Sequence, residues 1–381
     1  MIRRTLLRSA ALAVCFQSAG FAWAQSGQVT IGVTLSTTGP AASLGIAEKN
    51  TIELLPKTLG GLPVQYIVLD DASDPTQAAK NARRFVESEK VDAIIGTSNT
   101  PGSLAVAEVA NESKTPQIAL APFTPKQIQW VFPLPQSVAV MSTALFEHMK
   151  QSGVKSLGFV GFSDAYGEAW LQDAQKTAAQ FGVSIVTTER FARTDQSVTA
   201  QTLKIMQAKP DAVLIAGSGT PAALPMRALR ERGYKGQLYQ THGVANNDFL
   251  RISGKADEGV ILPTGNVLVV EQLAEGNPSK KPGLSYVQAY EAKHGASSRS
   301  PFGAYAQDAY LLLDQAVAVA AKKAKPGSAD FRSALRDAME GVKDLPVTHG
   351  VISMSPTDHS GYSQASRVLV TIEKSSWKLL K

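Results

Sequence analysis

The chain has 381 residues, of which 44% are hydrophobic and 18% are charged, proportions typical of a folded globular protein and not of a disordered one. Its formal net charge is +6, and three of the positive charges, Arg3, Arg4 and Arg8, lie in a segment that we expect to be removed, which leaves +3 for the remainder. This excess is small, and no cluster of lysines and arginines with interleaved aromatic residues is present, so the composition argues against nucleic acid as a partner.

Residues 1–24 have the layout of a secretory signal peptide. A basic start precedes an apolar stretch, and the small-x-small ending at 22–24 predicts cleavage before Gln25. A membrane anchor is the less favoured interpretation, because Arg8, Gln17 and Ser18 interrupt the apolar stretch. Export by this segment predicts a periplasmic protein.

The only cysteine, Cys15, lies inside the predicted signal peptide. It is either the lipid-carrying residue of a lipoprotein signal or a filler of the apolar stretch, and the bulky Val14 before it favours the second interpretation. The mature chain then has no thiol. This excludes disulfides, a cysteine-based zinc site and a cysteine nucleophile.

Short apolar stretches with β propensity alternate with helical stretches from residue 28 onwards. The predicted strands are 29–35, 63–70, 91–96 and 116–121, and, beyond Pro135, 156–162, 183–191, 212–216 and 237–243. The predicted helices are 42–55, one that opens at Asp74-Pro75, 104–110, 138–151, 167–181 and 199–208, followed by 285–293, 305–321 and 331–339. Two last strands, 350–354 and 367–374, flank a turn. The alternation predicts the α/β class, with two successive units that each have a parallel sheet between helices.

Ligands of open parallel sheets bind at the carboxyl ends of the strands, where loops and helix N-termini meet. Six loops of the predicted sheets end there: 36–45, 97–102, 121–125, 163–167, 217–221 and 241–247. We therefore expect the functional residues among them.

The loop Gly217-Ser218-Gly219-Thr220-Pro221-Ala222 follows a predicted strand and has the form G-x-G-x-x-A, close to a dinucleotide-binding loop. The next strand lacks the carboxylate that would bind a ribose, and Pro221 lacks one N–H that a phosphate would need. Nicotinamide cofactors are also unexpected outside the cytoplasm. We therefore predict no cofactor, and expect Ser218 and Gly219 to offer backbone N–H groups to a small acidic or polar ligand.

Catalytic and metal-binding patterns are not found. The stretch Gly161-Phe162-Ser163-Asp164-Ala165 lacks the second glycine of a nucleophile elbow. The five histidines, at positions 148, 242, 294, 349 and 359, have no spacing typical of metal ligands. The sequence therefore predicts a binding protein and not an enzyme, with no metal.

Several motifs in order resemble the solute-binding proteins of ABC transporters, of the branched-chain amino-acid type with the type I periplasmic binding fold. They are "VTIGVTLSTTGPAASLG", "DDASDPTQAAKNARRFVESEKVDAIIG", "SDAYGEAW" and "DAVLIAGSGTPAAL", and the resemblance covers nearly the whole mature chain. It implies two lobes joined by three crossings, near Pro135, Pro263 and Leu345. The first lobe would comprise 25–137 plus 266–344 and the second 138–265 plus 345–381. It also implies a monomer that delivers a small ligand to an ABC permease.

The resemblance places the carboxylate-binding side of the cleft on seven residues of the first lobe: Ser43, Leu44, Asn99, Thr100, Ala121, Pro122 and Phe123. The acidic position that binds an ammonium group in this family falls on His242. A buried ammonium without an anion costs several kcal/mol, so His242 argues against an amino acid and for a carboxylate without an amine. Phe123, Tyr166 and Phe302 are expected to enclose a flat ring. With "GPAASLGIAEKN", "GFSDAYGEAW" and "PTDHSG", this resembles binders of aromatic acids such as benzoate or coumarate.

Other interpretations of these residues stay open. The alternative for the three aromatic side chains is a place in a hydrophobic core, and the alternative for His242 is a contact with a neighbouring loop. His359 is interpreted as a structural turn residue. A branched-chain amino-acid ligand, a ligand sensor that signals to a membrane receptor, and an exported enzyme with the same fold are the alternative functions.

Overall fold

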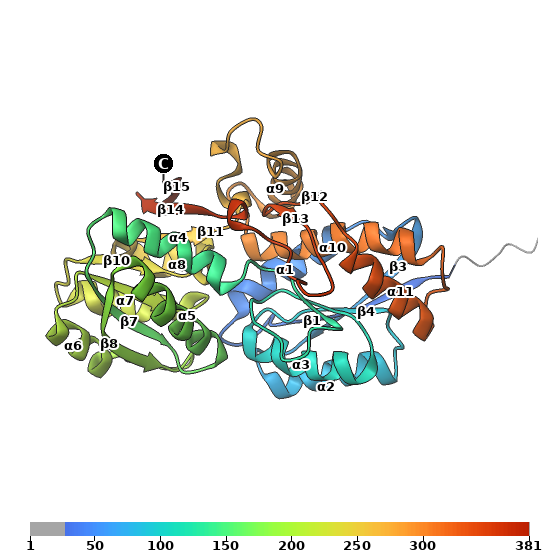
Figure 1. Cartoon of the computed structure of the whole chain (residues 1–381), viewed down its shortest axis with the longest axis horizontal. Coiled ribbons are helices and arrows are strands. Elements are labelled where there is room, and N and C mark those ends of the chain that lie inside the picture. Colours follow the sequence, from blue (N-terminus) through green and yellow to red (C-terminus); the bar gives the residue numbers. More distant parts are fainter. Residues whose placement is uncertain (1–26, 381) are drawn as a thin grey trace, which may run out of the picture.

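The computed structural model describes residues 27–380, which form two α/β lobes side by side along the long axis of the molecule (Figure 1). The predicted signal peptide and Cys15 lie outside the described residues. Within residues 27–380, no helix combines the length and the apolar character needed to cross a membrane. Each lobe is built on one mainly parallel sheet, which confirms the predicted fold class.

The first lobe contains a six-stranded sheet in the order β2-β3-β1-β4-β5-β6. Its strands are β1 (Val29–Leu35), β2 (Thr58–Leu59), β3 (Leu62–Asp70), β4 (Ala93–Ile95), β5 (Gln117–Ala119) and β6 (Val131–Pro133). All neighbouring pairs are parallel except the β2–β3 hairpin. Because β1 is central and covered on both faces, nearly all of its side chains are buried, as expected for a parallel strand.

The first lobe has six helices, three of which come from the C-terminal part of the chain. They are α1 (Ala42–Leu54), α2 (Pro75–Glu87), α3 (Thr100–Ser113), α9 (Lys280–His294), α10 (Pro301–Ala320) and α11 (Ala329–Glu340). The predicted start of α2 is confirmed, since the side chain of Asp74 accepts a hydrogen bond from the N–H of Gln77 and Pro75 occupies the first turn. α10 packs against α1, so segments far apart in sequence form one layer (Figure 1).

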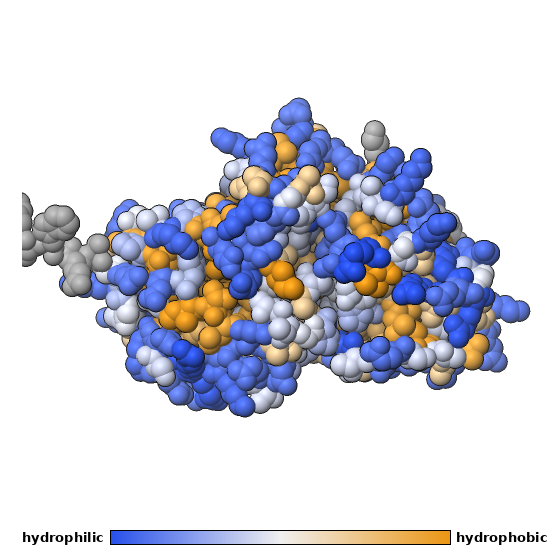
Figure 2. Space-filling model, turned by 180° about the vertical axis from the view of Figure 1, so that it is seen from behind, coloured by the Kyte–Doolittle hydropathy of each residue, from blue (hydrophilic) through white to orange (hydrophobic). Residues whose placement is uncertain are grey.

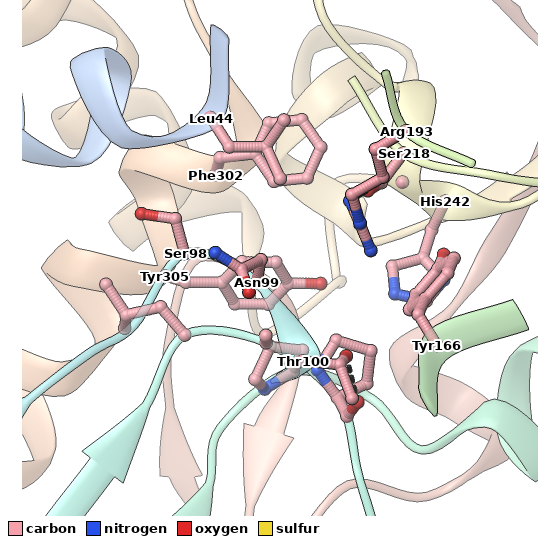
Figure 3. A pocket seen from close by; sticks show the side chains of 15 residues that line it. Leu44, Ser98, Asn99, Thr100, Tyr166, Arg193, Ser218, His242, Phe302 and Tyr305 are labelled. Carbon is pink, nitrogen blue, oxygen red and sulfur yellow. Dashed lines mark hydrogen bonds between the residues drawn. The ribbon is translucent and has the colours of Figure 1, made fainter. Parts of the chain in front are cut away.

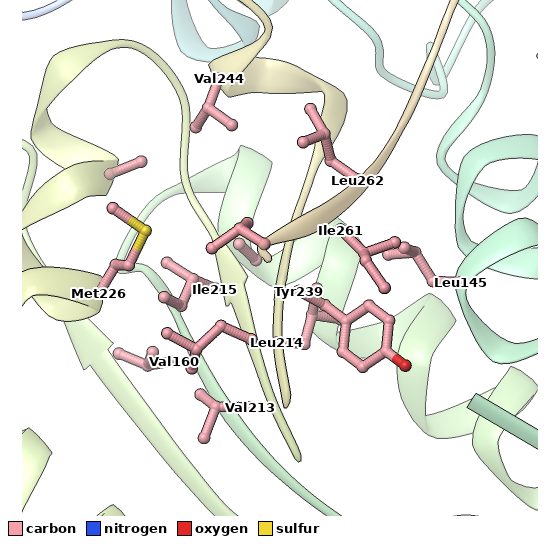
Figure 4. Close-up of a cluster of buried hydrophobic side chains, with 14 of the residues drawn as sticks. Leu145, Val160, Val213, Leu214, Ile215, Met226, Tyr239, Val244, Ile261 and Leu262 are labelled. Atoms are coloured by element: carbon pink, nitrogen blue, oxygen red, sulfur yellow. The ribbon is translucent and has the colours of Figure 1, made fainter. Parts of the chain in front are cut away.

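The second lobe contains a seven-stranded sheet in the order β15-β14-β11-β10-β9-β7-β8. Its strands are β7 (Ser156–Phe162), β8 (Ser184–Phe191), β9 (Ala212–Ala216), β10 (Gln237–Gln240), β11 (Ile261–Thr264), β14 (Val368–Glu373) and β15 (Ser376–Leu379). Its helices are α4 (Val138–Gln151), α5 (Ala165–Phe181), α6 (Thr199–Ala208), α7 (Ala223–Glu231) and α8 (Asn247–Ser253). β9 is buried at every residue and carries Val213, Leu214 and Ile215 into the core shown in Figure 4.

The chain passes between the lobes three times: after β6, after β11 and before β14. The third crossing lies later than the expected position near Leu345. The strands β12 (Leu345–Pro346) and β13 (Val351–Ile352) pair only with each other. Four side chains that follow Leu345 belong to the core of the first lobe: Val347, Ile352, Met354 and Tyr362. Apolar contacts therefore hold this segment on the first lobe, and the chain joins the second sheet only at Val368.

The surface seen in Figure 2 is largely hydrophilic, with separate apolar areas over both lobes. The large apolar side chains that are most exposed, such as Leu203 on α6 and Ile46 on α1, lie on different elements and form no single patch. Loops at the carboxyl ends of the two sheets face each other between the lobes, which positions the site described next.

Candidate ligand-binding site

A pocket with about 330 Å³ of empty space lies between the lobes, at the carboxyl ends of both sheets. The first lobe and the first crossing line it with Leu44, Ser98, Asn99, Thr100, Leu120, Ala121, Pro122, Pro135, Phe302 and Tyr305. The second lobe lines it with Tyr166, Arg193, Ser218, His242 and Gly243. No aspartate or glutamate side chain is among these described lining residues.

The apolar wall comes mainly from the first lobe. Leu44 from α1 and the rings of Phe302 and Tyr305 from α10 lie together on one side of the pocket in Figure 3. The Tyr305 ring stacks on His349 with the ring centroids 3.8 Å apart, and its hydroxyl donates a hydrogen bond of 2.6 Å to Gln136 Oε1. Tyr305 is therefore held in place from behind and presents a rigid aromatic surface.

The polar side chains of the first lobe are already hydrogen-bonded within the fold. Asn99 donates to Ser36 Oγ at 2.9 Å, and its Oδ1 accepts from the N–H of Gly102 at 2.9 Å, which caps α3. Thr100 Oγ1 donates to the carbonyl of Pro122 at 2.8 Å. These bonds fix the start of α3 at the pocket and leave the positive end of its dipole facing the space.

Arg193 lies after β8 and enters the pocket from the second lobe. Its Nε donates to Asp164 Oδ2 at 2.6 Å, its Nη1 donates to Ser218 Oγ at 2.9 Å, and its guanidinium carbon lies 4.2 Å from the centre of the Phe162 ring. The Nη2 atom is buried and has no hydrogen-bond partner among the residues that the structure describes. The guanidinium of Arg193 is therefore held rigidly, and the N–H groups of its Nη2 atom are available to a ligand.

His242 is buried beside Arg193, and Figure 3 shows nitrogen atoms of the two side chains on the same side of the pocket. Neither ring nitrogen of His242 has a hydrogen-bond partner within residues 27–380. Burial, with a smaller repulsion from His349, lowers the pKa of His242 to about 3. The ring is therefore neutral at pH 7 and offers one N–H donor and one acceptor.

Tyr166, at the start of α5, completes the wall of the second lobe. Its hydroxyl donates a hydrogen bond of 2.8 Å to Thr241 Oγ1, and Thr241 Oγ1 in turn donates to the carbonyl of Gly217. Burial raises the pKa of Tyr166 to about 12, so the phenol stays neutral. The Tyr166 ring lies edge-on to His242, with the centroids 6.3 Å apart.

The structure brings nine of the twelve predicted site residues to this pocket: Leu44, Asn99, Thr100, Ala121, Pro122, Tyr166, Ser218, His242 and Phe302. Phe123 points elsewhere, because it packs against Ala107, Ala110 and Val131 and lines a neighbouring cleft. Ser43 lines another neighbouring pocket. The N–H of Gly219 is used in a 2.8 Å bond to the carbonyl of Gly243.

Six lining residues were not predicted: Ser98, Leu120, Pro135, Arg193, Gly243 and Tyr305. The sequence could have predicted Arg193, since the loop after the strand 183–191 ends at the same edge of the sheet as the six predicted loops. It could not have predicted Tyr305, because its place depends on how α10 docks on the first lobe. His359 stacks on Phe132 at 4.1 Å and bonds to the carbonyl of Val131, a structural role.

Comparison with known proteins places these features in a family. The profile of the family described as periplasmic binding protein matches residues 28–373. "Leu/Ile/Val-binding protein homolog 3" of Brucella melitensis is 26% identical over 368 residues, which cover 92% of this chain and 93% of the relative.

Two solved structures illustrate the likeness of the fold. An extracellular ligand-binding receptor from Rhodopseudomonas palustris HaA2 is 47% identical with a TM-score of 0.91, and the match covers 93% of this chain and all of the receptor (100%). A solute-binding protein of an ABC transporter from R. palustris, solved in complex with benzoate, has a TM-score of 0.79 at 21% identity, over 93% of this chain and 96% of its own. The match of the family profile to almost the whole described chain, together with the two lobes and the pocket between them, shows that the protein belongs to the periplasmic binding protein family.

Proposed function

We propose that this protein is the periplasmic solute-binding component of an ABC importer, exported by a signal peptide at residues 1–24, and that its ligand is a small aromatic carboxylate similar to benzoate or coumarate. The observation that carries the choice of ligand is the pairing of Arg193 with a neutral His242 in a pocket whose described lining has no acidic side chain. The family membership carries the broader function.

In this proposal the carboxylate of the ligand binds Arg193 and His242 of the second lobe, and not the first-lobe residues on which the family resemblance placed it. A buried N–H without a partner costs about 1–3 kcal/mol, and Nη2 of Arg193 regains this energy when a carboxylate oxygen accepts its hydrogen bond. The neutral His242 donates a second bond from its protonated nitrogen. Asp164 and Ser218 hold the guanidinium in position before the ligand arrives, so little side-chain entropy is lost.

The ring of the ligand then lies against the apolar wall of the first lobe. Leu44, Phe302 and Tyr305 supply this wall, and Tyr166 closes the opposite side. Aromatic pairs add about 0.5–1.5 kcal/mol beyond the area that they bury. The benzoate named for the R. palustris structure fits the chemistry of this pocket, and we extend it to this chain as part of the proposal.

A branched-chain amino acid is the second candidate, favoured by the names of the curated relatives. Its ammonium group needs an anion when it is buried, and the described lining residues supply none. The positive charge of Arg193 is already paired with Asp164, so this side chain offers an ammonium group no acceptor, and the neutral His242 offers at most one lone pair. We therefore rank this ligand below an aromatic acid.

Ligand contacts with both lobes favour the closed arrangement, which the permease then recognises. A ligand that binds only the folded protein stabilises it by about 2.7 kcal/mol at a hundredfold excess over its Kd. The test is a thermal-shift screen of benzoate, p-coumarate and leucine, followed by calorimetry on every ligand that raises Tm. We expect the two aromatic acids to raise Tm and leucine to leave it unchanged. A rise with leucine alone would replace the aromatic-acid assignment with the second candidate.

A further inference from the structure

A buried carboxyl group lies directly behind the pocket wall of the first lobe. Glu48, on α1, is fully buried, and its Oε2 is hydrogen-bonded to the hydroxyl of Ser98. Its other oxygen, Oε1, has no hydrogen-bond partner among the residues that the structure describes. Ser98 is one of the lining residues of the pocket and Glu48 is not, so Glu48 contacts the pocket lining only through Ser98.

Hydrogen bonds extend from Glu48 along the pocket wall. The Oγ of Ser98 accepts from the N–H of Ser36 at 2.9 Å, and the Oγ of Ser36 accepts from the side chain of Asn99 at 2.9 Å. The Oγ of Ser36 also donates to Asp71 at 2.7 Å. One network therefore ties α1, which carries the pocket residue Leu44, to the pocket segment 98–100.

The surroundings of Glu48 favour its neutral form. The ionisable groups that bear on it are Asp71, which is acidic, and Tyr286 from α9, whose own pKa is raised well above its ordinary value by burial. Neither supplies a positive charge, and the unpartnered Oε1 leaves half of the carboxylate charge without a hydrogen-bond donor. Burial raises the pKa of Glu48 to about 8, although the bond to Ser98 opposes this shift.

We propose that Glu48 is a positioning residue of the binding site: its neutral carboxyl group holds Ser98 and the pocket segment 98–100 in place, and its ionisation in alkaline solution weakens the binding of an anionic ligand. This inference rests on the proposed function, because it takes the ligand to be an anion. A negative charge on Glu48 would repel that anion across a poorly screened interior and would add to the charge of Asp71.

The range from pH 7 to 9.5 isolates Glu48 from the other groups at the pocket. A benzoate probe is fully ionised throughout, since ordinary carboxyl groups titrate near pH 4. His242, with a pKa of about 3, stays neutral, and so does Tyr166, with a pKa of about 12. A change in affinity over this range therefore reports on Glu48 and not on the groups that face the ligand.

The experiment is calorimetric titration with benzoate at pH 7, 8, 9 and 9.5 for the wild type, Glu48→Gln and Glu53→Gln. Glu53 lies on the same helix, is exposed and pairs with Lys49, so its replacement controls for the same chemical change at the surface. The wild type and Glu53→Gln are expected to lose about tenfold in affinity between pH 7 and 9.5. Glu48→Gln, which keeps a neutral hydrogen-bonding group, is expected to bind within about threefold of the wild type at pH 7 and to show no pH dependence. A flat profile for the wild type, or the same decline in Glu48→Gln, would overturn the inference.

Denaturant unfolding without ligand provides a test that does not depend on the proposed function. Between the ordinary carboxyl pKa of the unfolded chain and the raised pKa of the folded protein, the folded state holds a proton that the unfolded state has released. The stability of the wild type relative to Glu48→Gln should therefore fall steadily as the pH rises from 5 to 8. A difference that stays constant refutes the inference even if benzoate binds. If the unfolding difference falls as expected and neither benzoate nor p-coumarate binds at any pH, the proposed function fails while the neutral state of Glu48 stands.

Discussion

The two walls of the pocket differ in how their polar groups are used. On the first lobe, the side chains of Asn99, Thr100 and Tyr305 all form hydrogen bonds to other groups of the protein. On the second lobe, Arg193 and His242 hold buried nitrogen atoms with no partner among the described residues. Buried polar groups are normally paired, so these unpartnered nitrogen atoms in the lining of the pocket are the expected contacts of a ligand. The first lobe then provides shape and an apolar surface, and the second provides the polar contacts that identify the ligand.

Replacement of Arg193 should have the largest effect. Arg193→Gln removes the charge and the unpartnered donor, and truncation of a buried charged pair typically costs about 2–5 kcal/mol, so we expect benzoate affinity to fall by about a hundredfold or more in calorimetry. Arg190→Gln is the matched control, because Arg190 lies on β8, is exposed and pairs with Glu168. Surface pairs of this kind contribute about 0–1 kcal/mol, and the affinity should hardly change. If Arg193→Gln lost less than about threefold in benzoate affinity, the polar contacts with the ligand would not come from the second lobe.

Acid should destabilise the ligand-free protein through His242. Its pKa is lowered to about 3 in the folded state and is near 6.5 in the unfolded chain, so the unfolded state binds more protons between these values. The neutral His242 ring makes its full contribution to the free energy of unfolding above pH 6.5. Below pH 6.5 this contribution decreases by up to about 1.4 kcal/mol per pH unit. Unfolding curves of the wild type and His242→Gln between pH 7 and 5 should diverge by about 2 kcal/mol. Parallel curves would mean that His242 is solvated and not part of a buried site.

Replacement of His242 by an apolar residue should weaken ligand binding without lowering the stability of the protein. His242→Leu removes two buried nitrogen atoms that have no partner among the described residues, so the free energy of unfolding should stay unchanged or rise by about 1 kcal/mol. The affinity for benzoate should fall by about tenfold, the value of one charge-assisted hydrogen bond. Chemical denaturation and calorimetry on the same sample measure both. A clear loss of stability with normal binding would assign His242 to the fold instead.

Asn99→Ala should show the reverse pattern and the smallest effect on binding. It removes the cap of α3 and the bond to Ser36, which should lower the stability by about 1 kcal/mol. The affinity for benzoate should change by less than about threefold, because this side chain is engaged within the lobe. If Asn99→Ala abolished binding as Arg193→Gln is expected to do, the polar contacts would lie on both lobes.

The sequence was sufficient to predict which loops form the site, but not which side chains of these loops enter the pocket. Strand and helix patterns predicted which loops end at the carboxyl edges, and the resemblance to the binding-protein family placed Leu44, Thr100 and His242 among the site residues. Phe123 differs because its ring reaches the apolar contacts with Ala107 and Val131 and not the pocket, a choice made by packing and not by its place in a loop.

Long-range contacts account for the remaining differences. Tyr305 reaches the pocket only because α10 docks against α1, across more than half of the chain. The third crossing lies beyond Tyr362 because apolar side chains after Leu345 join the first core. Glu48 gave no sign in the sequence, since a helical glutamate is usually exposed and only the docked fold buries it.

A crystal structure of the wild type with benzoate would show which lobe binds the carboxylate. We expect the carboxylate to lie within hydrogen-bonding distance of Arg193 Nη2 and of one ring nitrogen of His242, with the ring against Phe302 and Tyr305. A carboxylate bound instead at the start of α3, against Asn99 and Thr100, with Arg193 out of contact, would contradict this expectation.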